Sequence, residues 1–343
     1  MNVAVSFDKV NIVFGDNPQS ALKMMDAGKT RAEIQEATGQ ILGVHNCSLD
    51  VEQGEILVLM GLSGSGKSTL LRAVNGLNPV VRGKVTVFDD DWSCDPAECS
   101  VEELRKVRRE CVAMVFQQFG LLPWRSVAEN VGLGLEFAGM PKAERAEKVA
   151  AQLELVGLTE RADSKVGELS GGMQQRVGLA RAFVTEAPIL LMDEPFSALD
   201  PLIRARLQDE LIDLQKALKR TIIFVSHDLD EAFKLGNRIA IMEGGRIVQC
   251  GTPRDIIANP INAYVADFVA HMNPMGVLRA RDVMTADISA APQSVDINTP
   301  IKDVMAMVAD GVKTVSVTDN GKPVGSLNAA DLMASLLDPG GNA

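Results

Sequence analysis

The sequence has no apolar run long enough to cross a lipid bilayer. Its longest apolar stretches, such as residues 56–60 and 189–192, have the length of buried strands, whereas a membrane-spanning helix needs about 20 mostly apolar residues. The first ten residues carry Asp8 and Lys9, which do not fit the apolar core of a secretory signal peptide. Both absences predict a cytosolic protein.

Basic residues are scarce relative to acidic ones. The chain has 34 Lys and Arg against 45 Asp and Glu, a net charge of −11. Proteins that bind nucleic-acid backbones generally have the opposite balance, so nucleic-acid binding is not expected. The five cysteines are scattered, and only Cys94 and Cys99 are close in sequence. We therefore expect free thiols in a reducing compartment rather than disulfides or a metal site.

Residues 1–270 alternate short apolar runs with helical patterns. The runs that predict buried strands are 10–14, 55–60, 111–116, 188–193, 221–226 and 238–242. This alternation is typical of an α/β domain with a largely parallel sheet. Residues 18–39 predict a helical insertion of two short helices, and Thr30 and Glu33 have the spacing of a capping box at the second one.

The pattern changes near residue 271. We expect a linker at 271–278 and a small α+β module at 279–338, because strand signals at 314–319 and 321–327 precede a helical pattern. Residues 339–343 are expected to be disordered.

Residues 61–69, GLSGSGKST, fit the phosphate-binding pattern G-x-x-x-x-G-K-[ST] between a predicted strand and a predicted helix. In this motif, backbone N–H groups surround phosphate oxygens, Lys67 reaches the β- and γ-phosphates, and the Ser68 hydroxyl ligates Mg²⁺. The predicted nucleotide-binding residues are Gly61, Ser63, Gly64, Ser65, Gly66, Lys67, Ser68 and Thr69.

A second element of the same chemistry is the apolar run 189–192, which ends in Asp193 and Glu194. The run predicts a buried strand with the two carboxylates at its end. We expect Asp193 to hold Mg²⁺ through water and Glu194 to orient or deprotonate the attacking water.

Residues 169–176, LSGGMQQR, resemble the signature sequence of ATP-binding-cassette (ABC) ATPases, and the resemblance covers roughly residues 3–270. It implies a P-loop NTPase fold with a helical subdomain at about 118–183. Ser170, Gly171 and Gly172 open a helix, whose N-terminus can bind an anion. In the family, Ser170 and Gly172 contact the γ-phosphate of ATP on a second subunit, so the resemblance implies a homodimer.

Other positions match further motifs of the family. By this resemblance, Gln117 senses the γ-phosphate and Mg²⁺, the segment 118–130 touches a membrane subunit, and His227 is the switch histidine at the γ-phosphate. Asp200 lies in the loop that crosses the dimer seam. Phe14 is placed where the family stacks an aromatic ring on adenine; the alternative is a core phenylalanine at a strand end.

Two further features resemble one branch of the family. The insertion at 18–39 is similar to the N-terminal extension of ATPases that drive uptake of glycine betaine, proline betaine or choline. Residues 279–338 resemble one cystathionine-β-synthase-type (CBS) motif, whereas members of this branch usually carry two. The motif's ligand pattern has a hydroxyl residue three positions before Asp331, and here Asn328 replaces it, which favours a dimerisation or docking module without a ligand.

The resemblance implies an ATP- and Mg²⁺-dependent importer ATPase, bound peripherally on the cytoplasmic side of the inner membrane. Its partners would be integral permease subunits and, indirectly, a solute-binding protein. The alternatives are an ABC ATPase of another small-solute importer, an exporter ATPase, a non-transport ABC ATPase and a regulatory binding module. Glu194 and His227 argue against an inactive module, and a single cassette without a long coiled coil argues against a non-transport ATPase.

Overall fold

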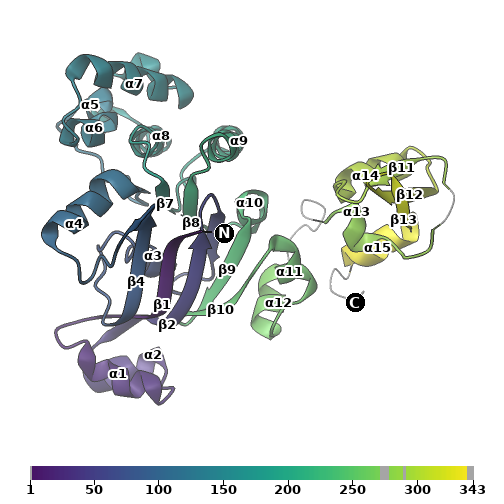
Figure 1. The fold of residues 1–343 in the computed structure, drawn as a ribbon, viewed down its shortest axis with the longest axis horizontal. Coiled ribbons are helices and arrows are strands. Elements are labelled where there is room, and N and C mark those ends of the chain that lie inside the picture. The colour runs from purple at the N-terminus through teal and green to yellow at the C-terminus, as the bar shows by residue number, and fades with distance from the viewer. Residues whose placement is uncertain (1, 271–277, 289–290, 338–343) are drawn as a thin grey trace. The chain divides into compact units, whose positions relative to one another are not determined.

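The computed structural model of the chain describes residues 2–270, 278–288 and 291–337 (Figure 1). Its internal contacts divide it into two units, Met1–His227 with Met242–Ile247, and Asp228–Ile241 with Val248–Ala343. Most of the predicted linker at 271–278 and all of the predicted disordered end at 339–343 lie outside the described residues. The division into a cassette at 1–270 and a module at 279–338 stays a prediction.

A six-stranded sheet contains five of the six predicted strands. Its order is β10-β9-β3-β8-β7-β6, and β3, β8, β7 and β6 pair in parallel. The strands are β3 (Ile56–Met60), β6 (Val112–Val115), β7 (Ile189–Asp193), β8 (Thr221–Val225), β9 (Arg238–Glu243) and β10 (Arg246–Gly251). Every residue of β3, β7 and β8 is buried, which explains their uninterrupted apolar sequences.

The apolar run 10–14 lies in a different sheet from the one expected. It ends β1 (Val3–Phe14), which pairs antiparallel with β2 (Ile41–Glu52) and β4 (Arg82–Asp89). With β5 (Trp92–Cys94) these strands form a four-stranded sheet of order β2-β1-β4-β5. β2 alternates buried and exposed residues over much of its length, and such half-buried strands give a weaker sequence signal than continuous apolar runs.

The helical insertion is present as predicted, with α1 (Gln19–Asp26) and α2 (Arg31–Thr38). The Thr30–Glu33 capping box is confirmed, and α2 ends at Gly39 in the left-handed conformation. The insertion packs on the antiparallel sheet through a buried cluster formed by Val13, Ala21, Met25, Ile34 and Leu42.

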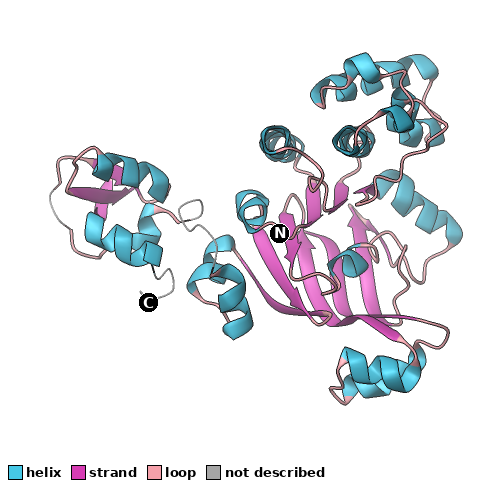
Figure 2. Cartoon of the chain, turned by 180° about the vertical axis from the view of Figure 1, so that it is seen from behind, coloured by secondary structure: helices cyan, strands magenta, loops and turns pink. Residues whose placement is uncertain are grey.

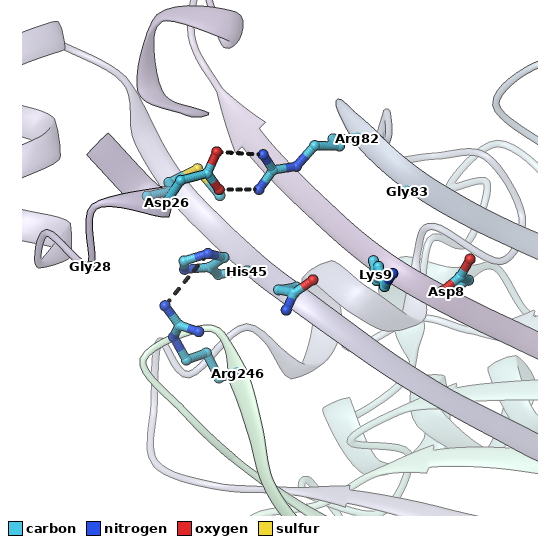
Figure 3. Close-up of a pocket in the computed structure, with 10 residues that line it drawn as sticks. Asp8, Lys9, Asp26, Gly28, His45, Arg82, Gly83 and Arg246 are labelled. Atoms are coloured by element: carbon cyan, nitrogen blue, oxygen red, sulfur yellow. Dashed lines mark hydrogen bonds and ion pairs between the residues drawn. The ribbon is translucent and has the colours of Figure 1, made fainter. Parts of the chain in front are cut away.

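An ion pair adds a second attachment of the insertion to this sheet. Asp26 accepts two hydrogen bonds, of 2.7 and 2.8 Å, from the guanidinium of Arg82 (Figure 3). The hydrogen bonds from Arg82 are the main reason why the pKa of Asp26 is lowered. The pair is largely solvated, so we attribute most of the docking free energy to the apolar cluster.

The helices alternate with the strands along the chain, and Figure 2 distinguishes the two kinds of element by colour. The first to follow the phosphate-binding segment is α3 (Lys67–Leu71), and α4 (Val101–Lys106) begins at a Ser100–Glu103 capping box. The predicted helical subdomain contains α5 (Val127–Val131), α6 (Leu133–Phe137), α7 (Lys142–Leu155) and α8 (Gly171–Phe183). The remaining helices before residue 271 are α9 (Pro201–Leu218), α10 (Leu229–Leu235), α11 (Pro253–Ala258) and α12 (Ala263–Val269).

The tail forms a small α+β arrangement, as predicted. Its elements are α13 (Ala280–Val283), β11 (Ser294–Asp296), α14 (Ile301–Ala309), β12 (Thr314–Asp319), β13 (Lys322–Asn328) and α15 (Ala329–Leu337). The strand order is β11-β12-β13. A core of its own includes Ile301, Val304, Val315, Val317 and Leu327. Within the described residues of the whole chain, no helix has both the length and the apolar character to cross a membrane.

Candidate nucleotide-binding site

The phosphate loop joins β3 to α3 through three glycines with positive φ, Gly61 (141°), Gly64 (76°) and Gly66 (103°). Residues with a side chain could not replace two of these glycines. A Cβ at Gly61 would lie 2.1 Å from the carbonyl oxygen of Met242, and a Cβ at Gly66 would lie 2.6 Å from that of Gly43. The glycines therefore permit both the left-handed backbone and the close packing of this loop.

Lys67 lies at the start of α3 with its ammonium turned back onto the loop. Its Nζ donates hydrogen bonds to the carbonyl oxygens of Gly61 (2.8 Å) and Leu62 (3.0 Å), and the residue is only 6% exposed. Burial lowers the pKa of Lys67, and the charges of Glu194 and Asp193 act in the opposite direction. The ammonium has three donors, so one remains for a phosphate oxygen.

Ser68 and Asp193 lie together at the ends of α3 and β7. The Ser68 hydroxyl donates to Oδ1 of Asp193 at 2.6 Å, and Arg72 Nη2 lies 2.8 Å from the other carboxylate oxygen. Asp193 is fully buried. A hydroxyl beside a carboxylate is the hard oxygen donor set that Mg²⁺ prefers when it also binds phosphates. These two residues therefore fit the metal that was predicted for them.

Glu194 follows Asp193 in a left-handed conformation, with φ of 49°. Its N–H donates to the carbonyl of Val225 on the neighbouring strand, which holds this uncommon backbone in place. Its Oε2 accepts a 3.2 Å hydrogen bond from Gln117 Nε2 and lies 3.4 Å from Nδ1 of His227. The structure thus brings all three predicted catalytic residues together.

One cavity of about 650 Å³ collects most of the predicted site. The site residues predicted from the sequence that line this cavity are Phe14, Ser63, Gly64, Gly66, Lys67, Ser68, Thr69, Gln117, Glu194 and His227. Gly61, Ser65 and Asp193 do not line the cavity. Ser65 and Asp193 are buried, and Gly61 supports Lys67 through its carbonyl.

Five further residues line the cavity and were not predicted: Arg31, Gln35, Ile41, Leu42 and Gly43. The last three belong to β2, whose antiparallel sheet was not expected. Arg31 and Gln35 are one helical turn apart on α2, so a shared helix face was readable from the sequence. Nothing in the sequence indicated what that face would meet.

The four remaining predicted residues, Ser170, Gly171, Gly172 and Asp200, do not line this cavity. Within one chain, Ser170 Oγ caps α8 by accepting from Met173 N, and Asp200 Oδ1 caps α9 by accepting from Ile203 N. Ser170 and Gly171 are exposed. Their contact with ATP across a dimer stays a prediction.

Comparisons with known proteins agree with this geometry. A family model described as "ABC transporter" matches residues 44–197. The glycine betaine/proline betaine transport system ATP-binding protein ProV of Escherichia coli is 49% identical over 82% of this chain and 70% of that protein. A dimeric ATP-binding cassette bound to ADP and phosphate superposes with a TM-score of 0.62 at 30% identity, over 73% of this chain and 98% of that one.

The chain belongs to the ATP-binding subunits of ABC transporters. The trimethylamine N-oxide transport system ATP-binding protein TmoW of Ruegeria pomeroyi is a further relative, 42% identical over 95% of this chain and 94% of its own. This ABC ATPase binds and hydrolyses ATP with Mg²⁺.

Gln175 is a functional candidate that sequence reasoning missed. It lies on α8, is buried, and donates through Nε2 to the carbonyl of Glu194 at 3.2 Å. Its Oε1 accepts from Ala198 N at 2.9 Å. In this ABC ATPase, one side chain therefore ties the signature helix to the loop that carries Glu194. It lies within the LSGGMQQR segment, where its position alone gave no indication of this contact.

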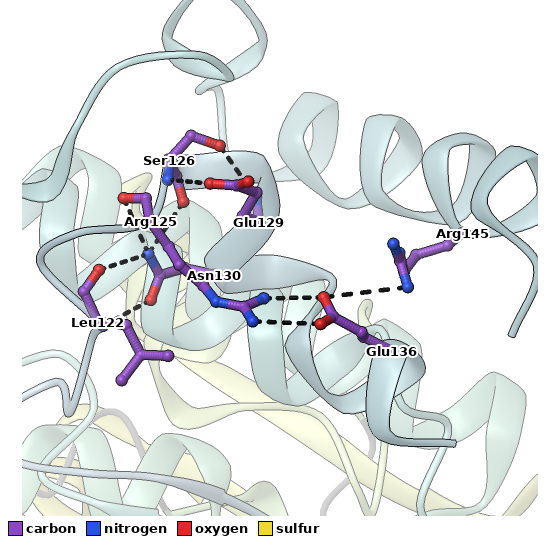
Figure 4. Close-up of polar contacts among 7 residues, drawn as sticks. All are labelled: Leu122, Arg125, Ser126, Glu129, Asn130, Glu136 and Arg145. Atoms are coloured by element: carbon purple, nitrogen blue, oxygen red, sulfur yellow. Dashed lines mark hydrogen bonds and ion pairs between the residues drawn. The ribbon is translucent and has the colours of Figure 1, made fainter. Parts of the chain in front are cut away.

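The segment after Gln117 is held by a polar network (Figure 4). The buried Asn130 side chain accepts from Leu122 N and donates to the carbonyls of Leu122 and Ser126. The Arg125 guanidinium donates two hydrogen bonds to Glu136. This network fixes the course of 122–130 on the helical subdomain.

A mainly apolar cavity of about 340 Å³ lies beside this segment. Its lining includes the apolar residues Leu77, Val112, Met114, Phe116, Leu133 and Phe137, and also three arginines, Arg108, Arg109 and Arg181. Phe137 is 63% exposed. A third cavity, of about 620 Å³, is lined by Asp26, His45, Arg82, Arg246 and others (Figure 3) and contains none of the predicted site residues.

Proposed function

We propose that this ABC ATPase powers the import of a small quaternary ammonium compound through separate permease subunits. The observation that carries the proposal is the 49% identity to a glycine betaine/proline betaine transport ATPase over 82% of the chain. The glycine betaine transport protein OpuAA of Bacillus subtilis is 48% identical over the same share. The insertion formed by α1 and α2 supports the same branch.

ATP binding and hydrolysis follow from the cavity at the phosphate loop. Lys67 binds the β- and γ-phosphates, and Ser68 and Asp193 hold Mg²⁺, which neutralises phosphate charge when bound. Glu194 accepts the proton of the attacking water, and Gln117 and His227 hold its carboxylate at the γ-phosphate end. The contacts of the Glu194 carboxylate with Gln117 and with His227 support the assignment of the three side chains to one catalytic group.

The working unit is a homodimer in this proposal. Ser170, Gly171, Gly172 and Asp200 lie outside the cavity of their own chain, which fits residues that complete the site of a second copy. Two chains would then enclose two ATP molecules, each between the phosphate loop of one chain and the signature of the other.

The permease binds beside the segment 118–130. The apolar cavity next to it, with the exposed ring of Phe137, is large enough for one or two side chains of a short helix of the permease. The ATPase is thereby held at the cytoplasmic face of the inner membrane as a peripheral subunit, and a solute-binding protein contacts the permease rather than this chain.

A second candidate solute is trimethylamine N-oxide. Two relatives that match this chain over nearly their full length are the trimethylamine N-oxide transport system ATP-binding proteins TmoW of Ruegeria pomeroyi and of Pelagibacter ubique. The latter is 40% identical over 97% of both chains. Both solutes carry a methylated nitrogen, so they belong to the same chemical class of small polar amine derivatives.

Uptake by a deletion strain tests the proposal and separates the two solutes. We expect the strain to lose uptake of labelled glycine betaine, proline betaine or choline, and to regain it with the wild-type gene but not with Glu194→Gln. Loss of trimethylamine N-oxide uptake alone would select the second solute. Normal uptake of all four compounds would contradict the transport assignment while leaving the ATPase intact.

A further inference from the structure

The helical insertion contributes a cation to the wall of the ATP cavity. Arg31 and Gln35 lie one turn apart on α2, and both line the cavity at the phosphate loop. The Arg31 guanidinium donates to two backbone carbonyls from different elements. Nη1 donates to Gly64 in the phosphate loop, and Nη2 donates to Gly43 on β2 at 2.7 Å. A residue of the insertion therefore bridges the phosphate loop and the antiparallel sheet.

The surroundings of this guanidinium are closely packed. A Cβ at Gly245 would lie 2.8 Å from Arg31 Nη2 and 2.9 Å from the carbonyl oxygen of Gly43. Gly245 has φ of 86°, and its N–H donates to the carbonyl of Ser65 while its carbonyl accepts from His45 N. The turn after β9 thus leaves space for Arg31 only because it carries no side chain there.

The charge of Arg31 has no carboxylate partner among the residues that the structure describes. Burial alone lowers its pKa, and its Nε is buried with no hydrogen-bond partner in the described ranges. Two other cations nearby are paired, since Lys29 binds Glu33 and Arg82 binds Asp26. A half-buried cation without a counter-charge is unfavourable. An anionic ligand in the cavity would supply that counter-charge.

Arg31 and Lys67 bind different carbonyls of the cavity wall. Arg31 donates to Gly43 and Gly64, and Lys67 donates to Gly61 and Leu62. A Cβ at Gly43, the residue that accepts from Arg31, would lie 2.9 Å from the ring of Phe14. The charges of Glu194 and Asp193, by contrast, act on the Lys67 ammonium and raise its pKa against the effect of burial. With the base on Phe14 and the γ-phosphate at Glu194, the phosphate nearest to Arg31 is the one bonded to the nucleoside.

We propose that Arg31 binds the α-phosphate of the nucleotide, so that the α1–α2 insertion is part of the ATP site. The α-phosphate is common to ATP, ADP and AMP, and adenosine lacks it. Arg31 therefore increases the affinity for all three nucleotides and does not take part in the hydrolysis step. The inference rests on the assignment of this cavity to ATP.

The test is nucleotide binding by the full-length chain with Arg31→Met. Affinities for ATP, ADP, AMP and adenosine are measured by calorimetry, with NMR titration for the weakest. We expect the three nucleotides to bind about tenfold more weakly or worse, as for the loss of a charge-assisted hydrogen bond, and adenosine to be unaffected. The matched control is Lys23→Met, which removes one charge from the exposed side of the same insertion and should change none of the affinities.

A second variant separates binding from support of the loop. Arg31→Lys keeps the charge but lacks the planar fork of donors, so it should retain more nucleotide affinity than Arg31→Met. If Arg31 only supports the fold, the melting temperature of the ligand-free protein falls, and AMP affinity in the folded variants stays at the wild-type value. That outcome overturns the proposal. If wild-type protein binds no ADP, the assignment of the cavity itself fails.

Discussion

The phosphate loop and the start of α15 in the tail differ in how their polar groups are satisfied. In the tail, Asn328 Oδ1 accepts from the N–H groups of Ala330 and Asp331, and Asp331 Oδ2 accepts from Asn328 N. The Asn328 side chain thus caps the first turn of α15, and the Asp331 side chain in turn accepts from the backbone of Asn328. Lys67 and Arg31 at the cavity, by contrast, keep N–H groups that no acceptor in the described part of the chain fills.

The difference separates a ligand site from a structural motif that resembles one. The CBS-type pattern calls for a hydroxyl residue where this chain has Asn328, and asparagine is among the best helix N-caps. A closed capping arrangement needs no nucleotide to complete it. The unfilled N–H groups of Lys67 and Arg31 at the cavity, in our proposal, are completed by the phosphates of the nucleotide.

The largest expected effect is at Glu194. Glu194→Gln should leave the phosphate loop intact and reduce steady-state ATP turnover at least a hundredfold, because it removes the proposed general base. MgATP binding should persist, and an ATP-bound dimer should accumulate. Phosphate release at the wild-type rate would contradict the assignment of Glu194.

Lys67→Ala is the contrasting variant for that experiment. It removes the buried ammonium to which we assign the β- and γ-phosphates, so ATP affinity itself should fall tenfold or more. Wild-type ATP affinity in this variant would exclude Lys67 from phosphate binding.

The next largest effect concerns the surface of the tail and its role in dimerisation. Partly buried apolar side chains, including Met305, Met307 and Val324, pack around its small core, and from residue 277 onward it has five basic residues against eight acidic ones. Such a surface fits a second tail better than an anionic membrane. We predict that two tails pair and hold the nucleotide-free dimer together.

Sedimentation of the nucleotide-free protein checks this prediction. The full-length chain should sediment as a dimer at micromolar concentration, and a chain truncated at residue 275 should sediment as a monomer. Equal behaviour of the two chains, whether monomeric or dimeric, would show that the tails do not pair.

The smallest effect is at the tail's helix cap. Asn328→Ala should destabilise the tail by about 1 kcal/mol, the usual cost of losing an N-cap, without changing ATP affinity or turnover. Thermal unfolding measures the first and the ATPase assay the second. Lys302→Ala, at an exposed position of α14, is the control and should change stability by less than about 0.5 kcal/mol. A change in nucleotide affinity with Asn328→Ala would reopen the case for a ligand in the tail.

Local patterns in the sequence were sufficient for much of the site. The phosphate loop, the strand ending in Asp193 and Glu194, and the Thr30–Glu33 capping box all depend on residues within a few positions of each other. Their short spacing fixes their geometry, and the structure places them as the sequence predicted.

Long-range contacts were not predictable in the same way. Arg31 meets Gly64, which is 33 positions away, only because β2 pairs antiparallel with β1 and places α2 beside the phosphate loop. Gln175 likewise reaches the carbonyl of Glu194 through the packing of α8. Neither residue type nor spacing indicates such meetings, because they depend on which sheet each strand joins.

Amide hydrogen exchange of the full-length protein, with and without MgADP, compares the two regions in one measurement. The account predicts that MgADP slows exchange in the phosphate loop at 61–69 and in α2 of the insertion, and leaves the start of α15 at 328–331 unchanged. Slowed exchange at 328–331, or none in α2, would contradict the claim that unfilled cationic donors mark the nucleotide site and closed capping marks a structural one.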